Sequence, residues 1–262
     1  MAPRTADAQG CVQPAGDVTM GIAGEVSVRG AWADTASVDR MIQALDAPRD
    51  AERDAGWPAE PGICDWGWVA VGHSPPGTGE PSGAAAQWLL DERLGWCLVF
   101  EGRLDNGPDL RVDLDECFPF RSGSDAEVVL AAYHRWGEHF VDHLQGVFAL
   151  ALVDAPREKV LLARDRKGAR PLYLWTGAGR LRFASTLPGL LAADGTDTVV
   201  DRATVAPALE DHGMAAAPQV MLSGVTLLPA ATLRVLEARG RARDRALLDD
   251  EGVPRLGSVG RS

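Results

Sequence analysis

The segment Gly146–Val153 constrains the fold more than any other part of the chain. Its sequence, GVFALALV, is apolar at both alternating sets of positions. A strand with one face in solvent alternates apolar and polar residues, whereas a strand covered on both faces is a continuous apolar run. We therefore expect this segment to be a strand with protein layers above and below it.

Other segments predict the elements around this strand. Short apolar runs bordered by turn residues predict strands at 21–28, 66–72, 86–90, 96–100, 159–163, 171–175 and 181–184, and a last strand pair across 219–236. Helical patterns fall at 35–46, 124–136, 186–193 and 201–211. Residues 47–62 are expected to form a loop, and 177–179 a hairpin turn. Helices placed between clusters of strands predict two stacked sheets with helices outside.

Composition excludes several functional classes. The net charge of −11 argues against a basic surface that would bind nucleic acid. No segment approaches the roughly 20 apolar residues that span a bilayer, and the N-terminus lacks the apolar core of a secretory signal, so we expect a cytoplasmic protein. The 4 cysteines form no CxxC motif, and neither a zinc site nor a disulfide framework is expected.

Four stretches, in this order and at matching distances, carry a resemblance to a known family: SDAEVVLAAYHRWG at 124–137, LQGVFALALVD at 144–154, LLARDRKGARPLY at 161–173 and FASTLPGLLA at 183–192. Together they resemble the class II glutamine amidotransferase domain of the asparagine synthetase type, as do GIAG at 21–24 and LVFEGRL at 98–104. The resemblance implies an α+β fold, the four-layer αββα sandwich of N-terminal-nucleophile hydrolases. We place this domain at 20–239, after a flexible leader at 1–19 and before a charged tail at 240–262 that has no apolar periodicity and could be disordered.

The resemblance also locates the nucleophile position, and this chain departs from the family there. In active members a terminal cysteine precedes Gly-Ile-Ala-Gly; its thiolate attacks the glutamine amide and its own α-amino group handles the proton. Here Met20 occupies that position, with 19 residues before it. A thioether cannot form the acyl intermediate, so no catalytic residue is expected.

The strand that binds the substrate in the family also differs in this chain, and the change again opposes catalysis. Its Asn-Gly-Glu has become Glu101-Gly102-Arg103. Glu101 replaces an amide donor that should stabilise the oxyanion, and losing such a donor typically costs about 10²–10³ in rate. Arg103 reverses the sign of a residue that should meet the substrate ammonium group.

Two further pocket positions lie outside this strand. The arginine that grips the substrate carboxylate after a Gly-His pair is absent, because Ser74 and Pro75 follow His73. The ammonium-binding acid is retained as Asp125. An acidic residue in the first turn of a helix also complements the helix dipole, which gives Asp125 a structural explanation.

The favoured interpretation is a catalytically inactive glutaminase-like subunit. It would support a separately encoded, ATP-dependent, amide-forming partner, as similar domains without the cysteine do in β-lactam synthetases and lasso-peptide cyclases. No cofactor is expected, and nothing in the chain resembles the Ser-Gly-Gly-x-Asp-Ser pyrophosphate loop.

Two alternatives stay open. N-terminal processing could expose Cys11 or Thr19 as the nucleophile of an active amidohydrolase. The pocket around Glu101, Arg103 and Asp125 could instead bind a small molecule or a peptide. His139 and His143 have the spacing of a metal pair on a helix, but no third ligand is evident, and we expect no metal site.

Overall fold

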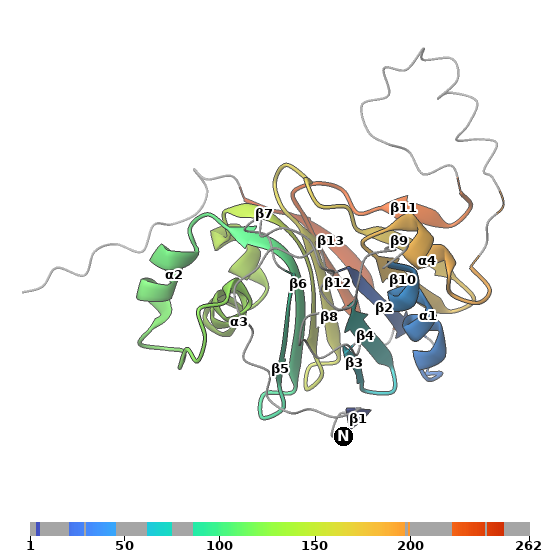
Figure 1. Cartoon of the computed structure of the whole chain (residues 1–262), viewed down its shortest axis with the longest axis horizontal. Helices are drawn as coiled ribbons and strands as arrows, with labels where there is room; N and C mark the ends of the chain where they lie inside the picture. Colours follow the sequence, from blue (N-terminus) through green and yellow to red (C-terminus); the bar gives the residue numbers. More distant parts are fainter. Residues whose placement is uncertain are drawn as a thin grey trace, which may run out of the picture.

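Two antiparallel sheets form the centre of the molecule in the computed structural model (Figure 1), which describes residues 4–5, 21–28, 30–45, 62–74, 86–196, 199, 222–238 and 240–248. The first sheet has the order β1-β3-β4-β2-β10-β9-β11. Its strands are β1 Arg4–Thr5, β2 Ile22–Ser27, β3 Gly62–Asp65, β4 Val69–His73, β9 Tyr173–Gly177, β10 Arg180–Ala184 and β11 Val225–Leu227.

The second sheet has the order β13-β12-β8-β7-β6-β5. Its strands are β5 Ala86–Asp91, β6 Trp96–Leu104, β7 Gly146–Asp154, β8 Lys159–Arg164, β12 Thr232–Glu237 and β13 Ala242–Ala246. The apolar run at 146–153 is β7, an inner strand between β6 and β8.

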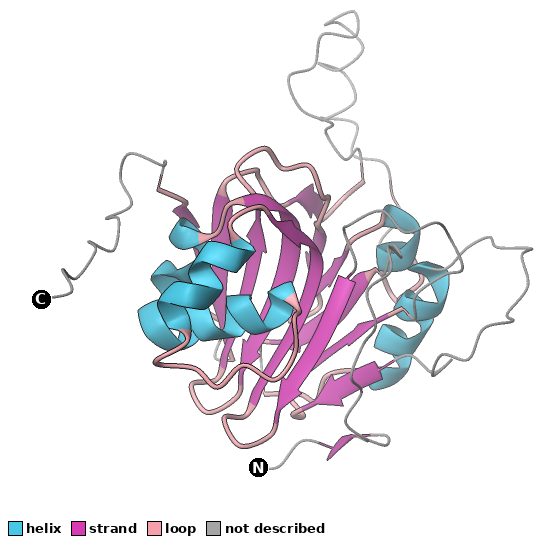
Figure 2. Ribbon diagram, turned by 60° about the vertical axis from the view of Figure 1, so that its left-hand side comes forward, coloured by secondary structure: helices cyan, strands magenta, loops and turns pink. Residues whose placement is uncertain are grey.

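Helices cover the outer face of each sheet (Figure 2). The helices α1 Thr35–Leu45 and α4 Leu187–Leu191 pack on the first sheet, and α2 Gly107–Leu114, α3 Asp125–Trp136 and the 3₁₀ helix η1 Gly137–His143 lie on the second. Three apolar cores separate the four layers. The expected αββα sandwich is confirmed.

Strand β7 shows why this sequence needs two cores. Phe148, Leu150 and Leu152 belong to the core under α3, whereas Ala149 and Ala151 belong to the core between the sheets. All of them are at most 1% exposed. The alternation of larger and smaller apolar side chains thus places bulk under the helices and small groups between the sheets.

Helix α3 begins with the expected N-cap, although the predicted capping box differs in detail. The Ser124 hydroxyl accepts a hydrogen bond from the Glu127 amide at 3.4 Å. The Glu127 carboxylate does not return to Ser124; it accepts from the amides of Arg121 and Ser122 at 2.9 and 2.7 Å. The acid therefore stabilises the preceding turn. Gly137, with φ of +55°, ends the helix.

Several expected elements lie elsewhere or were missed. Strand β3 begins at the last residue of the expected 47–62 loop, whose other residues lie outside the described part of the chain, and neither β3 nor α2 was predicted. The expected strand pair at 219–236 is wrong as a pair, because β11 joins β9 in the first sheet while β12 joins β8 in the second.

The segments outside the expected domain contain strands. In the leader, β1 pairs with β3. In the tail, β13 pairs with β12, and Asp244 forms an ion pair with Arg234 at 2.6 Å. Alternating charges suit a strand whose side chains are mostly exposed, and apolar periodicity therefore could not reveal it. The predicted helix at 201–211 lies outside the described residues. Among the helices of the described segments, none combines the length and apolarity needed to cross a bilayer.

Candidate functional site

Polar side chains replace apolar ones at one end of the layer between the sheets. Cys97 and Val99 of β6 and Phe183 of β10 belong to the inter-sheet core. Successive strand residues alternate between faces, so Glu101 and Ser185 continue the same two rows past the apolar part. Both are buried. This end of the layer is the candidate site.

Glu101 is the least satisfied charged group in the site. It is 6% exposed, and its Oε1 lies 3.4 Å from Arg170 Nη1. Its Oε2 is buried and has no hydrogen-bond partner among the described residues. Burial raises the pKa of Glu101 to about 7, against the opposing effects of the Arg170 charge and the Ser185 hydroxyl.

The turn between β8 and β9 carries Arg170, and its charged residues hold its shape. Asp165 accepts from the amides of Lys167 and Ala169 at 2.8 and 3.1 Å. The Arg164 guanidinium donates to the carbonyl of Arg170 at 2.6 Å and also to those of Gly168 and Leu228. The charged turn that marks the family resemblance is thus a backbone scaffold, and Arg170 is the residue it presents to the site.

Two serines fix the beginning of β2. The Ser74 hydroxyl accepts from the Gly21 amide at 2.8 Å, and the Ser185 hydroxyl accepts from the Ile22 amide at 3.0 Å. Ser74 follows β4 and Ser185 follows β10, the neighbours of β2 in the sheet. Met20, Cys11 and Thr19, on which the sequence-based nucleophile predictions fall, lie outside the described residues.

Gly102 occupies a position that only glycine can fill. Its φ is +139°, and a Cβ there would lie 2.0 Å from the Val147 carbonyl oxygen. The next residue, Arg103, is exposed at the rim and pairs with Asp105 at 3.3 Å. Arg103 thus lies beside the site with its charge compensated by Asp105.

Asp125 connects the first turn of α3 to β6. Its Oδ2 accepts from the Leu104 amide at 2.8 Å. Burial raises its pKa, while the Leu104 amide and the charges of Arg111 and Arg103 act in the opposite direction. The carboxylate therefore has a structural bond, as its position in the helix suggested.

The histidines singled out by sequence have separate surroundings. His73 is buried beside Trp88, with ring centroids 5.1 Å apart, and burial lowers its pKa. His139 contacts Asp142 at 3.2 Å, while His143 stacks on Trp136. Both lie on η1, and a 3₁₀ helix has three residues per turn, so a spacing of four does not align them on one face. In the described part of the chain, no group of three or more potential metal ligands occurs.

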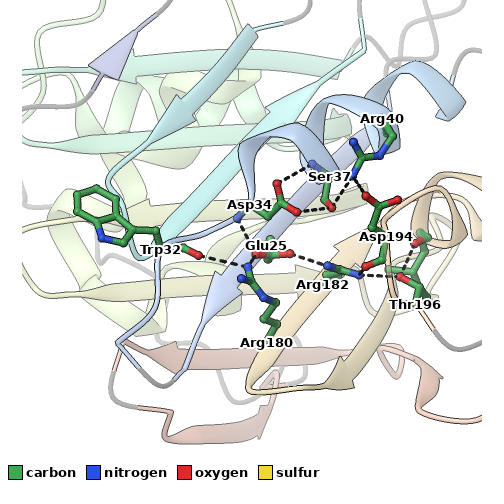
Figure 3. Close-up of polar contacts among 10 residues, drawn as sticks. Glu25, Trp32, Asp34, Ser37, Arg40, Arg180, Arg182, Asp194 and Thr196 are labelled. Atoms are coloured by element: carbon green, nitrogen blue, oxygen red, sulfur yellow. Dashed lines mark hydrogen bonds and ion pairs between the residues drawn. The ribbon is translucent and has the colours of Figure 1, made fainter.

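A second polar cluster lies on the outer face of the first sheet (Figure 3). Glu25 of β2 is 0% exposed, accepts from Arg182 Nε at 2.8 Å and also pairs with Arg180. It accepts from the Asp34 amide at 2.8 Å. Arg182 also donates to Thr196 at 2.9 Å. This cluster ties β2 and β10 to the segments around α1 and α4, and we assign it a structural role.

The structure thus brings together part of the predicted pocket. Glu101 faces the site, Gly102 lies tightly against the backbone of β7, Arg103 lies at the rim, and Asp125 is committed to the Leu104 amide. Three residues of the site were not predicted from the sequence as site residues: Ser74, Arg170 and Ser185. Ser74 and Ser185 follow the ends of β4 and β10, and Arg170 lies in the β8–β9 turn, so only the family stretches around them gave a signal.

Comparison with known proteins identifies the fold and family. A family model described as a glutamine amidotransferase domain matches residues 20–245, which includes most of β13. Asparagine synthetase B of Escherichia coli is 38% identical over 109 residues, 41% of this chain and 20% of that protein. Asparagine synthetase 3 of Bacillus subtilis is 36% identical over 108 residues, 41% of this chain and 18% of that protein. The chain therefore matches about a fifth of the length of these relatives.

A solved structure supports the same fold at low sequence identity. The glutamine phosphoribosylpyrophosphate amidotransferase of B. subtilis aligns with a TM-score of 0.57 and 14% identity, over 86% of this chain and 49% of that chain. This chain therefore belongs to the class II glutamine amidotransferase domain family, with the sandwich of N-terminal-nucleophile hydrolases.

Proposed function

We propose that this domain does not hydrolyse glutamine and serves as the companion of a separately encoded, ATP-dependent, amide-forming protein of the asparagine synthetase type. Acting on such a partner would place it in the cytoplasm. The proposal rests mainly on Glu101, whose buried carboxyl group lies where the family has an amide donor.

The chemistry of Glu101 opposes amide hydrolysis. Attack on an amide carbonyl places negative charge on its oxygen, and active sites stabilise that charge with hydrogen-bond donors. With a pKa of about 7, Glu101 is increasingly ionised as the pH rises above neutrality, and a carboxylate repels an oxyanion. Arg170 lies 3.4 Å from Glu101 and already compensates this internal charge.

Met20 removes the other requirement of the reaction. A thioether carries no acidic proton and cannot become the thiolate that attacks an amide. The sandwich, in contrast, retains its two sheets and three cores. Retention of the fold without the reactive groups favours a structural contribution to a partner. The asparagine synthetases among its relatives suggest the partner's class.

Ammonia release from glutamine tests the absence of hydrolysis. Purified full-length chain should release no more ammonia than buffer, whereas E. coli asparagine synthetase B is the positive control. Intact mass of the same preparation reports any processing. A form beginning at Cys11 or Thr19 that releases ammonia, and loses activity after alanine substitution of that first residue, would establish the amidohydrolase alternative.

The companion role needs its own test. The chain is co-expressed with an asparagine synthetase-type protein from the same cell, and pyrophosphate release during ATP-dependent amide formation is measured with and without it. We expect the partner's activity or soluble yield to fall when the chain is omitted. Equal activity and yield in both preparations would contradict the companion role while leaving the absence of hydrolysis intact.

A further inference from the structure

We propose that residues 242–248, which are strand β13 and the two leucines after it, form a strap that charged contacts hold against η1 and β12. The strap detaches at high ionic strength while the rest of the domain stays folded. The inference does not depend on the proposed function. It rests on the way the strap is attached, through many polar contacts and little apolar burial.

The side chains of the strap contribute little to the apolar cores. Within β13, four of the five side chains are exposed and that of Arg245 is partly buried. Leu247 is the one strap residue in the core under α3, with 9% exposure, whereas Leu248 is 43% exposed. A segment with so few buried apolar contacts opens locally at a much lower cost than the cores. The stability of the strap therefore depends on its polar contacts.

Asp142 on η1 is the central attachment of the strap. Its carboxylate is 2% exposed, and both of its oxygens lie 2.9 Å from Arg245 Nη1. Its Oδ1 also accepts from the Leu248 amide at 2.9 Å. Burial acts to raise the pKa of Asp142, but the hydrogen bonds from Arg245 and the Leu248 amide lower it below its ordinary value. A buried acid thus stays charged with two residues of the strap as partners.

Further ionic contacts lie on either side of this attachment. Arg243 pairs with the carboxylate of Glu138, and Arg245 Nη2 donates to the Glu138 carbonyl at 2.8 Å. On the β12 side, the guanidinium of Arg234 donates to both carboxylate oxygens of Asp244 at 2.6 Å. Charges of both signs on the strap therefore have partners on the domain.

Arg166, in the β8–β9 turn, fixes the end of the strap. Its Nη2 donates to the carbonyls of Leu248 and Asp142, both at 2.9 Å, and its Nη1 donates to the Leu144 carbonyl at 2.7 Å. One guanidinium group thus joins the last residue of the strap to the end of η1. Most of the contacts that hold the strap involve at least one charged group.

Salt should act differently on the strap and on the cores. The screening length falls from about 10 Å at 0.1 M salt to about 3 Å at 1 M, which weakens ion pairs that lie near the surface. The burial of apolar side chains does not depend on such screening. Detachment would also make β12 the edge of the second sheet and leave its backbone open to a strand of another chain.

Hydrogen exchange of the full chain at about 0.1 M and about 1 M sodium chloride tests the proposal, with rates divided by those of an unfolded peptide of the same sequence under each condition. At the higher salt we expect amides of 242–248 to exchange at least about threefold faster and those of β7 to be unchanged. Asp142→Asn should accelerate exchange in 242–248 at least about tenfold at the lower salt. Glu127→Gln, a buried acid of α3 that accepts from the amides of Arg121 and Ser122, is the matched control and should leave the strap unchanged.

The salt series on the wild-type chain does not depend on whether a variant folds. Exchange in 242–248 that is the same at both salt concentrations would overturn the proposal. So would an acceleration shared equally by β7, because the strap would then open only with the whole domain. A folded Asp142→Asn variant with wild-type protection in 242–248 would exclude Asp142 as the attachment and contradict the proposal as well.

Discussion

Two buried carboxylates, Glu25 and Glu101, show how differently this fold treats its structural and its site residues. Glu25 has guanidinium groups of Arg180 and Arg182 against it, together with the Asp34 amide. Glu101 has one ion pair, at 3.4 Å with Arg170, and lies beside the Ser185 hydroxyl, and one of its oxygens lacks a hydrogen-bond partner among the described residues. Burial alone therefore does not identify a structural charge; the number of its partners does.

The difference follows from where each residue lies. Glu25 projects from the outer face of the first sheet, where two arginines of β10 at i and i+2 share that face and the register places Arg182 opposite Glu25. Glu101 projects between the sheets at the end of an apolar row. A ligand site needs polar atoms whose hydrogen bonds are not all made within the protein. In this chain the Glu101 carboxyl group has such an atom, its Oε2.

The largest expected effect is at Glu25. Glu25→Gln keeps the shape but leaves Arg182, which is 3% exposed, without a counter-charge. Removing one partner of a buried pair destabilises by about 3–5 kcal/mol. Urea unfolding should show this loss, and the exposed control Glu92→Gln should stay within about 0.5 kcal/mol of wild type.

A double variant makes the Glu25 comparison sharper. Glu25→Met with Arg182→Met removes both charges and should recover most of the stability lost in Glu25→Gln, because replacing a buried pair by apolar groups is often nearly neutral. If the double variant is as unstable as the single one, the cluster contributes through its hydrogen bonds to the surrounding loops rather than through charge compensation.

The second largest effect concerns the pH dependence at Glu101. Its pKa is raised from 4.5 to about 7 in the folded chain, so the folded state binds more protons between these values. The free energy of unfolding should therefore fall as the pH rises through this window, by about 3 kcal/mol, and stay level above it.

Glu101→Gln isolates this contribution, because the remaining titrating groups are common to both proteins. The two unfolding free energies should differ little near pH 4.5, and the variant should be the more stable by about 3 kcal/mol at pH 8. A difference that does not change with pH would show that Glu101 is ionised or neutral throughout, and the contrast with Glu25 would lose its electrostatic basis.

These two carboxylates also mark what the sequence could and could not reveal. The apolar run of β7 and the cap of α3 are local patterns, and the layers they predict are present. The residues around Glu101 come from the end of β10 and from the β8–β9 turn, and Ser74, which holds the start of β2, comes from the end of β4. No local pattern brings Ser74, Ser185 and Arg170 together. Strand β13 escaped detection because its side chains face solvent and carry charge instead of apolar periodicity.

A smaller effect is expected at Arg170. It is the charge that lowers the pKa of Glu101, although its side chain is 25% exposed and can interact with water. Arg170→Met should raise that pKa further and cost about 1 kcal/mol or less at pH 8, with almost no cost at pH 5, where Glu101 is mainly protonated. Unfolding at the two pH values measures the difference. An equal cost at both would assign Arg170 a packing role instead.

The smallest effect is expected at Arg103, which the sequence placed in the pocket and the structure places at its rim. Arg103 and Asp105 are each 57% exposed, and an ion pair of that kind contributes between zero and about 1 kcal/mol. Arg103→Ala should therefore change the free energy of unfolding by less than about 0.5 kcal/mol and leave the pH profile of Glu101 unaltered. Its charge does favour the ionised form of Asp125, which bonds the Leu104 amide, so the more sensitive measurement is amide exchange at Leu104. We expect faster exchange at Leu104 without a loss of global stability. A loss of stability comparable to that of Glu25→Gln would mean that the exposed Arg103 contributes as much as the buried cluster around Glu25. The number of partners would then no longer distinguish the two regions.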